Sequence, residues 1–107
     1  MDRTALVYYN DIPAGRLTQG ENVYTFEYED TYLKDAGLPA ISLSFPKQKE
    51  AFTAQVLFPF FYGLLSEGEN KIIQCRRLKI DENDHFTLLI KTAGSDTIGA
   101  VTVREME

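Results

Sequence analysis

The sequence predicts an α+β domain: a small, mostly antiparallel sheet of about four to five strands packed with three to four short helices. Strand-forming segments gather in the first third of the chain, apolar residues at helical spacing follow, and a β-branched run closes it. Separate runs of strands and helices, without regular alternation, are typical of this class. The 107 residues include 44% apolar side chains and contain no linker or repeat, which predicts one domain spanning 1–107.

The first segments are predicted to form a hairpin and a third strand beside it. Residues 4–9 are β-branched and aromatic, and a cluster of turn formers at 10–15 leads back into a second strand at 16–18. The segment 23–29 alternates between two faces. We expect one of these faces to line the core, because it carries only aromatic residues: Tyr24, Phe26 and Tyr28.

A short helical turn followed by extended chain is predicted next. Asp30 has the side chain of a helix cap, and Gly37 is a typical helix stop. The chain should then run extended from 41 to 45, since Pro46 disfavours the helical conformation for the residue before it.

A helix with a proline near its start is predicted within 52–65, where the apolar residues follow helical spacing. Proline in a helix interior costs about 3 kcal/mol, whereas the first turn does not use its missing N–H group. Because Pro59 interrupts the pattern, the regular helix should begin near Phe58 or be kinked there.

Two more helices and a last strand complete the expected fold. One helix covers about 69–78, and Asp84 is expected to cap another at 86–91, which would end at Gly94. The β-branched segment 97–104 should return to the sheet of the first strands. The inner side of the 69–78 helix is expected to carry Ile72, Ile73 and either Cys75 or Arg76.

Composition and charge indicate which partners the protein can bind and in which cellular compartment it resides. The net charge of −5 repels nucleic-acid phosphate, and the basic run 76–79 is interpreted as a solvated helix end. No segment reaches the roughly 20 apolar residues of a membrane span, and the N-terminus lacks an export signal. The single Cys75 fits a reducing compartment. We therefore expect a cytoplasmic protein that contacts neither a membrane nor nucleic acid directly.

The residues that carry chemistry do not form a familiar active site in the sequence. His85 is the only imidazole and has no partner at metal-ligand spacing. The glycine-bearing segments 63–68 and 94–99 lack the lysine of a phosphate-binding loop, and the protein-kinase motifs are missing as well. No catalytic residue, cofactor or metal is expected, and the chain is interpreted as a non-enzyme.

Three blocks in order carry a family resemblance. They are Ile-Ser-Leu-Ser-Phe-Pro at 41–46, Phe-Phe-Tyr-Gly-Leu-Leu-Ser-Glu-Gly at 60–68, and Gly-Ser-Asp-Thr-Ile-Gly-Ala-Val at 94–101. Together they resemble the N-terminal subdomain of HipA-type serine/threonine kinases of bacterial toxin–antitoxin operons, over nearly the whole chain. Ser66 departs from the family, in which proline is common at that position, and this puts the rigidity of the loop in doubt.

The resemblance implies a regulatory module without catalysis. In full-length relatives this subdomain packs on the kinase body, and as a separate HipS-like protein it binds and restrains the kinase. The expected partner is a HipA-like serine/threonine kinase encoded nearby, which the chain would bind in trans and inhibit. The alternative is the structural half of a split or truncated kinase, which would stabilise or activate the kinase body. A DNA-binding antitoxin is a remote third class, disfavoured by the charge and by the lack of a helix-turn-helix motif.

One loop is the candidate contact with that kinase. It follows the most apolar helix and could project past the domain surface, although an ordinary helix connection would have the same sequence. Self-association, the kinase substrate and the direction of regulation are left open by the sequence. The residues predicted to bind the partner are Ser66, Glu67, Gly68, Glu69 and Asn70.

Overall fold

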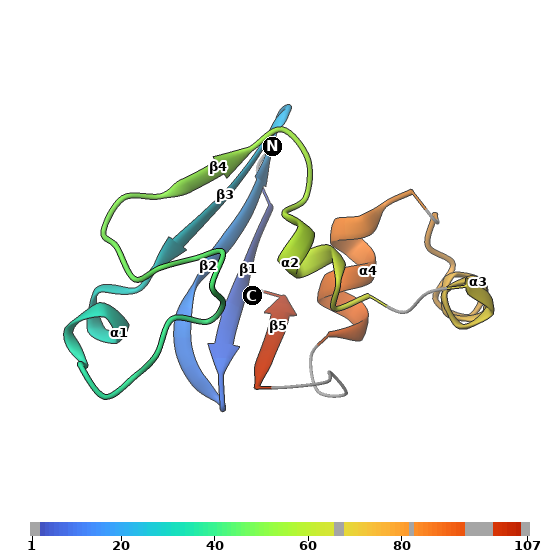
Figure 1. Ribbon diagram of the computed structural model, residues 1–107. Coiled ribbons are helices and arrows are strands. Elements are labelled where there is room, and N and C mark those ends of the chain that lie inside the picture. The colour runs from blue at the N-terminus through green and yellow to red at the C-terminus, as the bar shows by residue number, and fades with distance from the viewer. Residues whose placement is uncertain (1–2, 66–67, 82, 94–99, 106–107) are drawn as a thin grey trace.

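A five-stranded antiparallel sheet with helices packed beside it forms the part of the chain that the computed structural model describes, residues 3–65, 68–81, 83–93 and 100–105 (Figure 1). The sheet order is β4-β3-β2-β1-β5. This architecture confirms the predicted α+β class. The elements are β1 (Arg3–Tyr9), β2 (Ile12–Gly20), β3 (Val23–Tyr28), α1 (Asp30–Lys34), β4 (Phe52–Ala54), α2 (Pro59–Tyr62), α3 (Gly68–Leu78), α4 (His85–Thr92) and β5 (Val101–Glu105).

The predicted hairpin is present, with a tighter turn than the sequence suggested. β1 pairs with β2 as far as Tyr9 and Ile12, so only Asn10 and Asp11 lie in the turn. Both have positive φ angles, 49° and 65°, as the favoured two-residue hairpin turn requires. The remaining turn formers belong to β2. There Gly15 is needed for a close approach, because a Cβ atom would lie 2.5 Å from the Glu27 carbonyl oxygen of β3.

The aromatic face of β3 lines the core, as predicted. Phe26 is fully buried and Tyr28 is 3% exposed, while Tyr24 is half-buried. The centre of the cluster is Phe45, whose ring centroid lies 4.9–5.9 Å from those of Phe26, Phe52, Phe58, Phe60 and Phe61. Ring pairs at such distances contribute beyond their burial, so this cluster holds the helix-bearing side of the sheet together.

Two predictions in the segment 30–45 are wrong. Asp30 is the first residue of α1 rather than its cap, and the N-cap position belongs to Glu29, whose carboxylate pairs with Arg16 at 2.9 Å. Residues 42–45 form a tight turn instead of extended chain, with a hydrogen bond of 3.0 Å from the Phe45 amide to the Ser42 carbonyl. The preference of a residue that precedes proline constrains only Phe45, so the three residues before it remain free to turn.

The segment 52–65 contains a strand before its helix, which corrects the helical interpretation of its first residues. Phe52–Ala54 pairs with β3 and places Phe52 opposite Phe26, where it joins the aromatic cluster. The helix itself begins as predicted, with Phe58 at the N-cap and Pro59 at the first helical position. It is only four residues long.

The last elements agree with the sequence in order and differ in one orientation. Asp84 caps α4, its Oδ1 accepting a hydrogen bond from the Thr87 amide at 3.2 Å, and β5 pairs antiparallel with β1. The predicted end of that helix at Gly94 and residues 97–99 of the strand lie outside the described residues. Of the residues expected on the inner side of α3, Cys75 alone is buried. The structure exposes the others, Ile72, Ile73 and Arg76.

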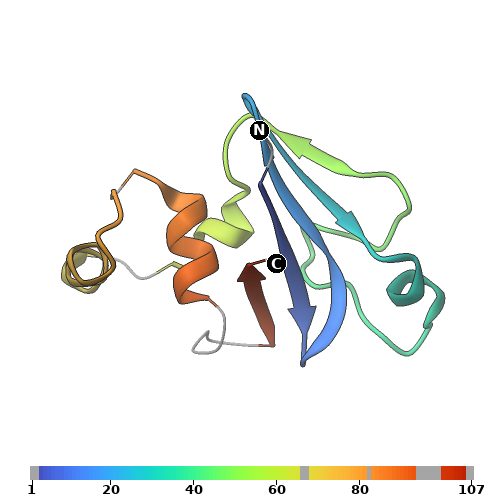
Figure 2. The same cartoon turned by 180° about the vertical axis from the view of Figure 1, so that it is seen from behind.

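The elements are spread along one axis of a molecule that measures 42 × 28 × 26 Å. Figures 1 and 2 both place α1 at one end, the sheet next to it, then α2 and α4, and α3 at the opposite end. Among the described residues, no helix is long and apolar enough to cross a membrane.

Candidate docking surface

The predicted contact segment connects α2 and α3. Ser66 and Glu67 lie outside the described residues, so their structure stays untested. Gly68, Glu69 and Asn70 form the first turn of α3. The segment therefore leads from the aromatic cluster to the outermost helix of the molecule.

Large apolar side chains are exposed on both sides of this segment. Within the described part of the chain, two of the exposed apolar residues, Ile12 and Val23, lie beside the hairpin turns of the sheet. The other exposed apolar residues form two groups, one before the segment and one after it. We call the first group the apolar rim: Leu43 in the 42–45 turn, Val56 before α2, and Tyr62 in α2, which are 104%, 69% and 43% exposed. The second group lies on α3 and consists of Ile72, Ile73 and Leu78.

Leu43 stands at the tip of a firmly held turn. The residues that enter and leave the turn, Ile41 and Phe45, are both buried, and the Ser44 amide donates to the Ser42 hydroxyl at 3.1 Å. Pro39, Ala40 and Pro46 line a shallow hollow next to Leu43. Because the turn is ordered in advance, a partner that covers Leu43 need not order it, which lowers the cost of binding.

Two buried tyrosines hold this turn against the sheet. The Tyr28 hydroxyl accepts from the Ile41 amide at 3.1 Å and donates to the Phe45 carbonyl, so it ties the two ends of the turn together. The Tyr32 hydroxyl donates to the Pro39 carbonyl. Burial raises the pKa of Tyr28, and burial together with neighbouring charges raises the pKa of Tyr32 to about 12. Both hydroxyls therefore remain protonated donors at neutral pH.

The turn and α2 are neighbours because Phe45 packs between them. Its ring lies 5.1 Å from Phe58 and 5.5 Å from Phe61 by centroids, and the second of these belongs to α2. Tyr62, also on α2, meets the His85 ring edge-on at 5.0 Å. His85 thus has a packing role at the start of α4, and no group of three or more His, Cys, Asp or Glu side chains in the described residues could hold a metal.

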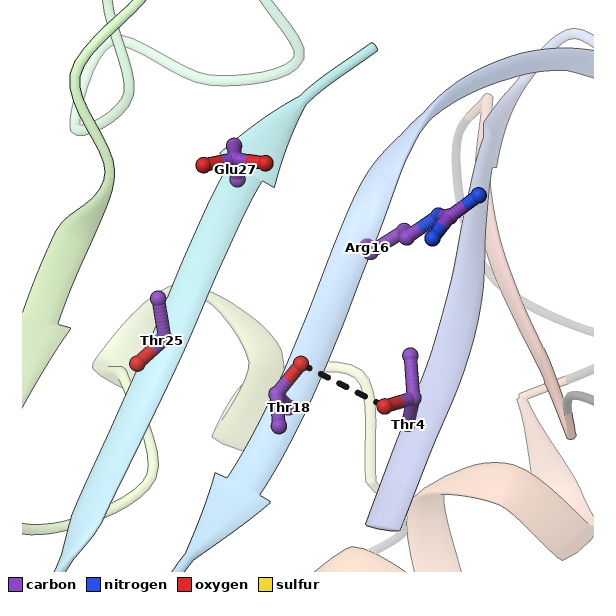
Figure 3. A pocket seen from close by; sticks show the side chains of 5 residues that line it. All are labelled: Thr4, Arg16, Thr18, Thr25 and Glu27. Atoms are coloured by element: carbon purple, nitrogen blue, oxygen red, sulfur yellow. Dashed lines mark hydrogen bonds between the residues drawn. The ribbon is translucent and has the colours of Figure 1, made fainter. Parts of the chain in front are cut away.

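The opposite face of the sheet carries a second hollow, shown in Figure 3. Facing strands align Thr4, Thr18 and Thr25 in one row, and the Thr4 and Thr18 hydroxyl oxygens lie 3.5 Å apart. Arg16 also lines it, but its guanidinium already pairs with Glu29, and Glu27 adds a further negative charge. The carboxylates offset the positive charge, so this hollow is poorly suited to an anionic ligand.

Sequence reasoning missed the apolar rim. It assigned Leu43 to extended chain and counted Val56 as part of a helical stripe, and the structure exposes both. No signal in the sequence marked Leu43 as exposed, because the alternation of apolar residues and serines from Ile41 to Phe45 predicts that Leu43 lies on the same buried face as both. What the geometry offers is a surface for binding a protein, with apolar side chains displayed on an ordered support.

Known proteins with similar sequences and structures identify the family of the chain. The sequence profile described as HipA N-terminal domain matches residues 5–104. An "Uncharacterized protein" of Haemophilus influenzae is 35% identical over 91 residues, which cover 85% of this chain and 81% of that protein. The "Putative kinase Y4mE" of Sinorhizobium fredii is 30% identical over 100 residues. This alignment covers 92% of the present chain but only 24% of the length of that relative.

A solved structure supports the same assignment. The "N-terminal domain of HipA toxin" superposes with a TM-score of 0.72 at 28% identity, covering 98% of this chain and 93% of that one. Fold, sequence profile and the order of the motifs agree, and the chain belongs to the HipA N-terminal domain family.

Proposed function

We propose that the chain is a non-catalytic module that binds a HipA-like serine/threonine kinase in trans and inhibits it, as a HipS-like antitoxin. The observation that carries this proposal is the alignment of almost the entire chain with about a quarter of a longer relative that is named as a kinase. A module that acts on a kinase in trans would do so through a non-covalent interface.

The apolar rim supplies anchors for such an interface. Stable complexes bury about 800 Å² on each partner and concentrate their binding energy in a few apolar and aromatic side chains. Leu43, Val56 and Tyr62 provide an aliphatic pair and an aromatic ring, displayed around the ordered turn and α2. The predicted segment 66–70 follows α2 in sequence, and we propose that it contributes to the same interface.

The free energies of burial and of association indicate that the apolar rim is not sufficient for tight binding without further contacts. Fully burying one large apolar side chain contributes about 1.5–3 kcal/mol, and because Val56 and Tyr62 are already partly buried, the three together contribute less than about 9 kcal/mol. Loss of translational and rotational freedom costs about 4–15 kcal/mol. The gain from burying the apolar rim is therefore about as large as the cost of association. Tight binding requires a second group of contacts.

Inhibition would follow from occlusion of the kinase cleft, or from holding the phosphate-binding loop of the kinase in an unproductive arrangement. The alternative is that the module completes the kinase and stabilises or activates it, and the same alignment with part of a longer kinase supports this alternative. Phosphoryl transfer by the kinase with and without the chain separates the two, because inhibition and activation have opposite signs.

Co-expression with the HipA-like kinase encoded next to it tests the proposal. The wild-type chain should co-purify with the kinase and restore growth of cells that the kinase arrests. Leu43→Ser should weaken both effects, whereas Val23→Ser, which alters an exposed apolar residue at a sheet turn, should weaken neither. Absence of a complex together with unchanged toxicity would reject the proposal.

A further inference from the structure

α3 and its C-terminal cap differ in charge from the rest of the chain. Residues 68–79 contain four basic side chains and one acidic side chain, a net charge of +3. The whole chain carries −5, so the remaining residues carry −8. A basic helix is therefore attached to an acidic body, and it lies at the end of the molecule farthest from α1 (Figures 1 and 2).

Apolar and basic residues share one exposed face of this helix. Ile72 and Arg76 are four residues apart, as are Ile73 and Arg77, so each pair occupies neighbouring positions on the helix surface. All four are exposed; Ile72 and Ile73 retain 39% and 50% of their accessible surface. We call these four residues the outer face of α3. Cys75, 5% exposed, lies beside this face on the buried side of the helix.

The end of α3 is held by a specific cap. Lys79 has a φ of 56°, and the Ile80 amide donates to the Cys75 carbonyl at 2.9 Å, the bond pattern of a Schellman motif. An isolated helix of 11 residues is marginally stable in water, and this cap defines where α3 ends. The outer face is thus part of a helix with a defined C-terminal end and the buried residue Cys75.

We propose that the outer face of α3 docks into an acidic groove with an apolar floor on the HipA-like kinase. This inference rests on the function proposed above and supplies the second group of contacts that the apolar rim requires. Helices commonly bind partners by laying an apolar face into a groove, and charges at the rim of such a contact accelerate association.

The chemistry favours a protein groove over other occupants. Two isoleucines on a four-residue face need an apolar surface, which a phosphate backbone does not offer. The −8 of the body also repels DNA and anionic lipid. A second copy has an acidic body as well, and reciprocal contacts between α3 of each copy and the body of the other would close with two-fold symmetry, so self-association is measured beside kinase binding. The kinase side of the groove should therefore carry the Asp and Glu residues.

The experiment compares two double charge reversals of equal size. Arg76→Glu with Arg77→Glu alters the outer face of α3, and Lys34→Glu with Lys49→Glu alters two exposed lysines near α1 at the opposite end. Binding kinetics to the purified kinase are measured at about 50 mM and about 500 mM NaCl. All altered residues are exposed, so the thermal midpoint of each variant should stay near the wild-type value. Because glutamate opposes the helix dipole in the last turn of α3, the helix content of each variant is compared with wild type by circular dichroism.

The α3 variant should associate about 10-fold more slowly than wild type at low salt, and the difference should fade at high salt. The α1 variant should differ by less than about threefold. Ile72→Ser with Ile73→Ser should instead raise the dissociation rate by about 10-fold, at both salt concentrations.

The outcomes that contradict the inference are distinct from those that contradict the proposed function. If wild type binds the kinase and the α3 variant behaves like the α1 variant, the docking role of α3 is overturned while kinase binding stands. If wild type does not bind the kinase, both fail. Binding of a DNA duplex, of anionic vesicles or of a second copy that depends on α3, in place of kinase binding, would also overturn the inference.

Discussion

The aromatic half of the molecule and α3 use apolar residues in opposite ways. Around the sheet, rings from strands, turn and α2 converge on Phe45 and leave little of their surface in water. On α3, Cys75 is buried while Ile72 and Ile73 remain exposed. Apolar residues that the fold does not bury contribute little to its stability and remain available to a partner. The comparison predicts that substitutions of the buried rings in the first region alter folding and that substitutions on the outer face of α3 alter binding.

Phe45→Ala should have the largest effect on folding. The side chain is 2% exposed and its removal leaves a cavity among several rings, which costs about 3–5 kcal/mol. Urea unfolding would show the loss as a lower midpoint. Phe45→Leu retains part of the volume and should lose clearly less. A cost below about 1 kcal/mol for the alanine variant would mean that the cluster does not depend on this ring.

Gly15→Ala should have the next largest effect on folding. The added Cβ atom would meet the Glu27 carbonyl oxygen and the Phe26 ring, and overpacking of this kind costs about 1–3 kcal/mol. Gly37→Ala is the matched control, because its nearest neighbour is the flexible Asp35 carboxylate at 3.3 Å. Equal melting temperatures for the two variants would show that β2 and β3 can move apart at no cost.

Tyr32→Phe should have a smaller effect that depends on pH. Loss of the hydrogen bond to Pro39 costs about 0.5–1.5 kcal/mol at neutral pH. The folded state raises the pKa of Tyr32 from 10.0 to about 12, so its proton is held more tightly than in the unfolded chain. This contribution is complete below pH 10 and is lost as the pH rises through 12. The phenylalanine variant does not titrate.

The difference in unfolding free energy between wild type and Tyr32→Phe should therefore shrink above pH 10. Denaturant titrations at about pH 7 and at about pH 11.5 measure it directly. A difference that stays constant over this range would show that Tyr32 titrates alike in the folded and unfolded chain.

Ile73→Ser should have the smallest effect on folding. The side chain is already half exposed, so the change in unfolding free energy should stay within about 0.5 kcal/mol. The same substitution should weaken kinase binding. A large loss of stability would place Ile73 in the core and remove the contrast between the two regions.

The sequence predicted those elements that local rules define. The first hairpin, the aromatic face of β3, the start of α2 at Pro59 and the cap by Asp84 each depend on a few adjacent residues, and all are confirmed. The β5 strand was recognised by its β-branched residues.

The missed elements depend on contacts between distant segments. The 42–45 turn is closed by the Tyr28 hydroxyl, which lies 13 residues before Ile41 in sequence. β4 exists because Phe52 reaches the aromatic cluster opposite Phe26, although the segment also fits helical spacing. The orientation of α3 was misassigned for a related reason, since periodicity marks an apolar face but does not reveal whether the domain itself covers that face.

The sequence predicted a segment of the chain as the candidate site, but it did not predict which apolar side chains around that segment are exposed. The segment 66–70 remains a prediction, while the structure adds exposed apolar residues before it and after it. A sequence in isolation does not distinguish an apolar residue that is buried in the core from one that is exposed on the surface. That distinction requires the solvent exposure of each side chain.

Calorimetric titration of the purified HipA-like kinase with this chain tests the central claim most directly. We predict a one-to-one complex with a negative heat-capacity change, the mark of buried apolar surface, and a loss of affinity of about tenfold or more for Leu43→Ser. The stability of that variant should equal that of wild type. The account is contradicted if the kinase and the chain do not associate, or if Leu43→Ser binds with the affinity of wild type.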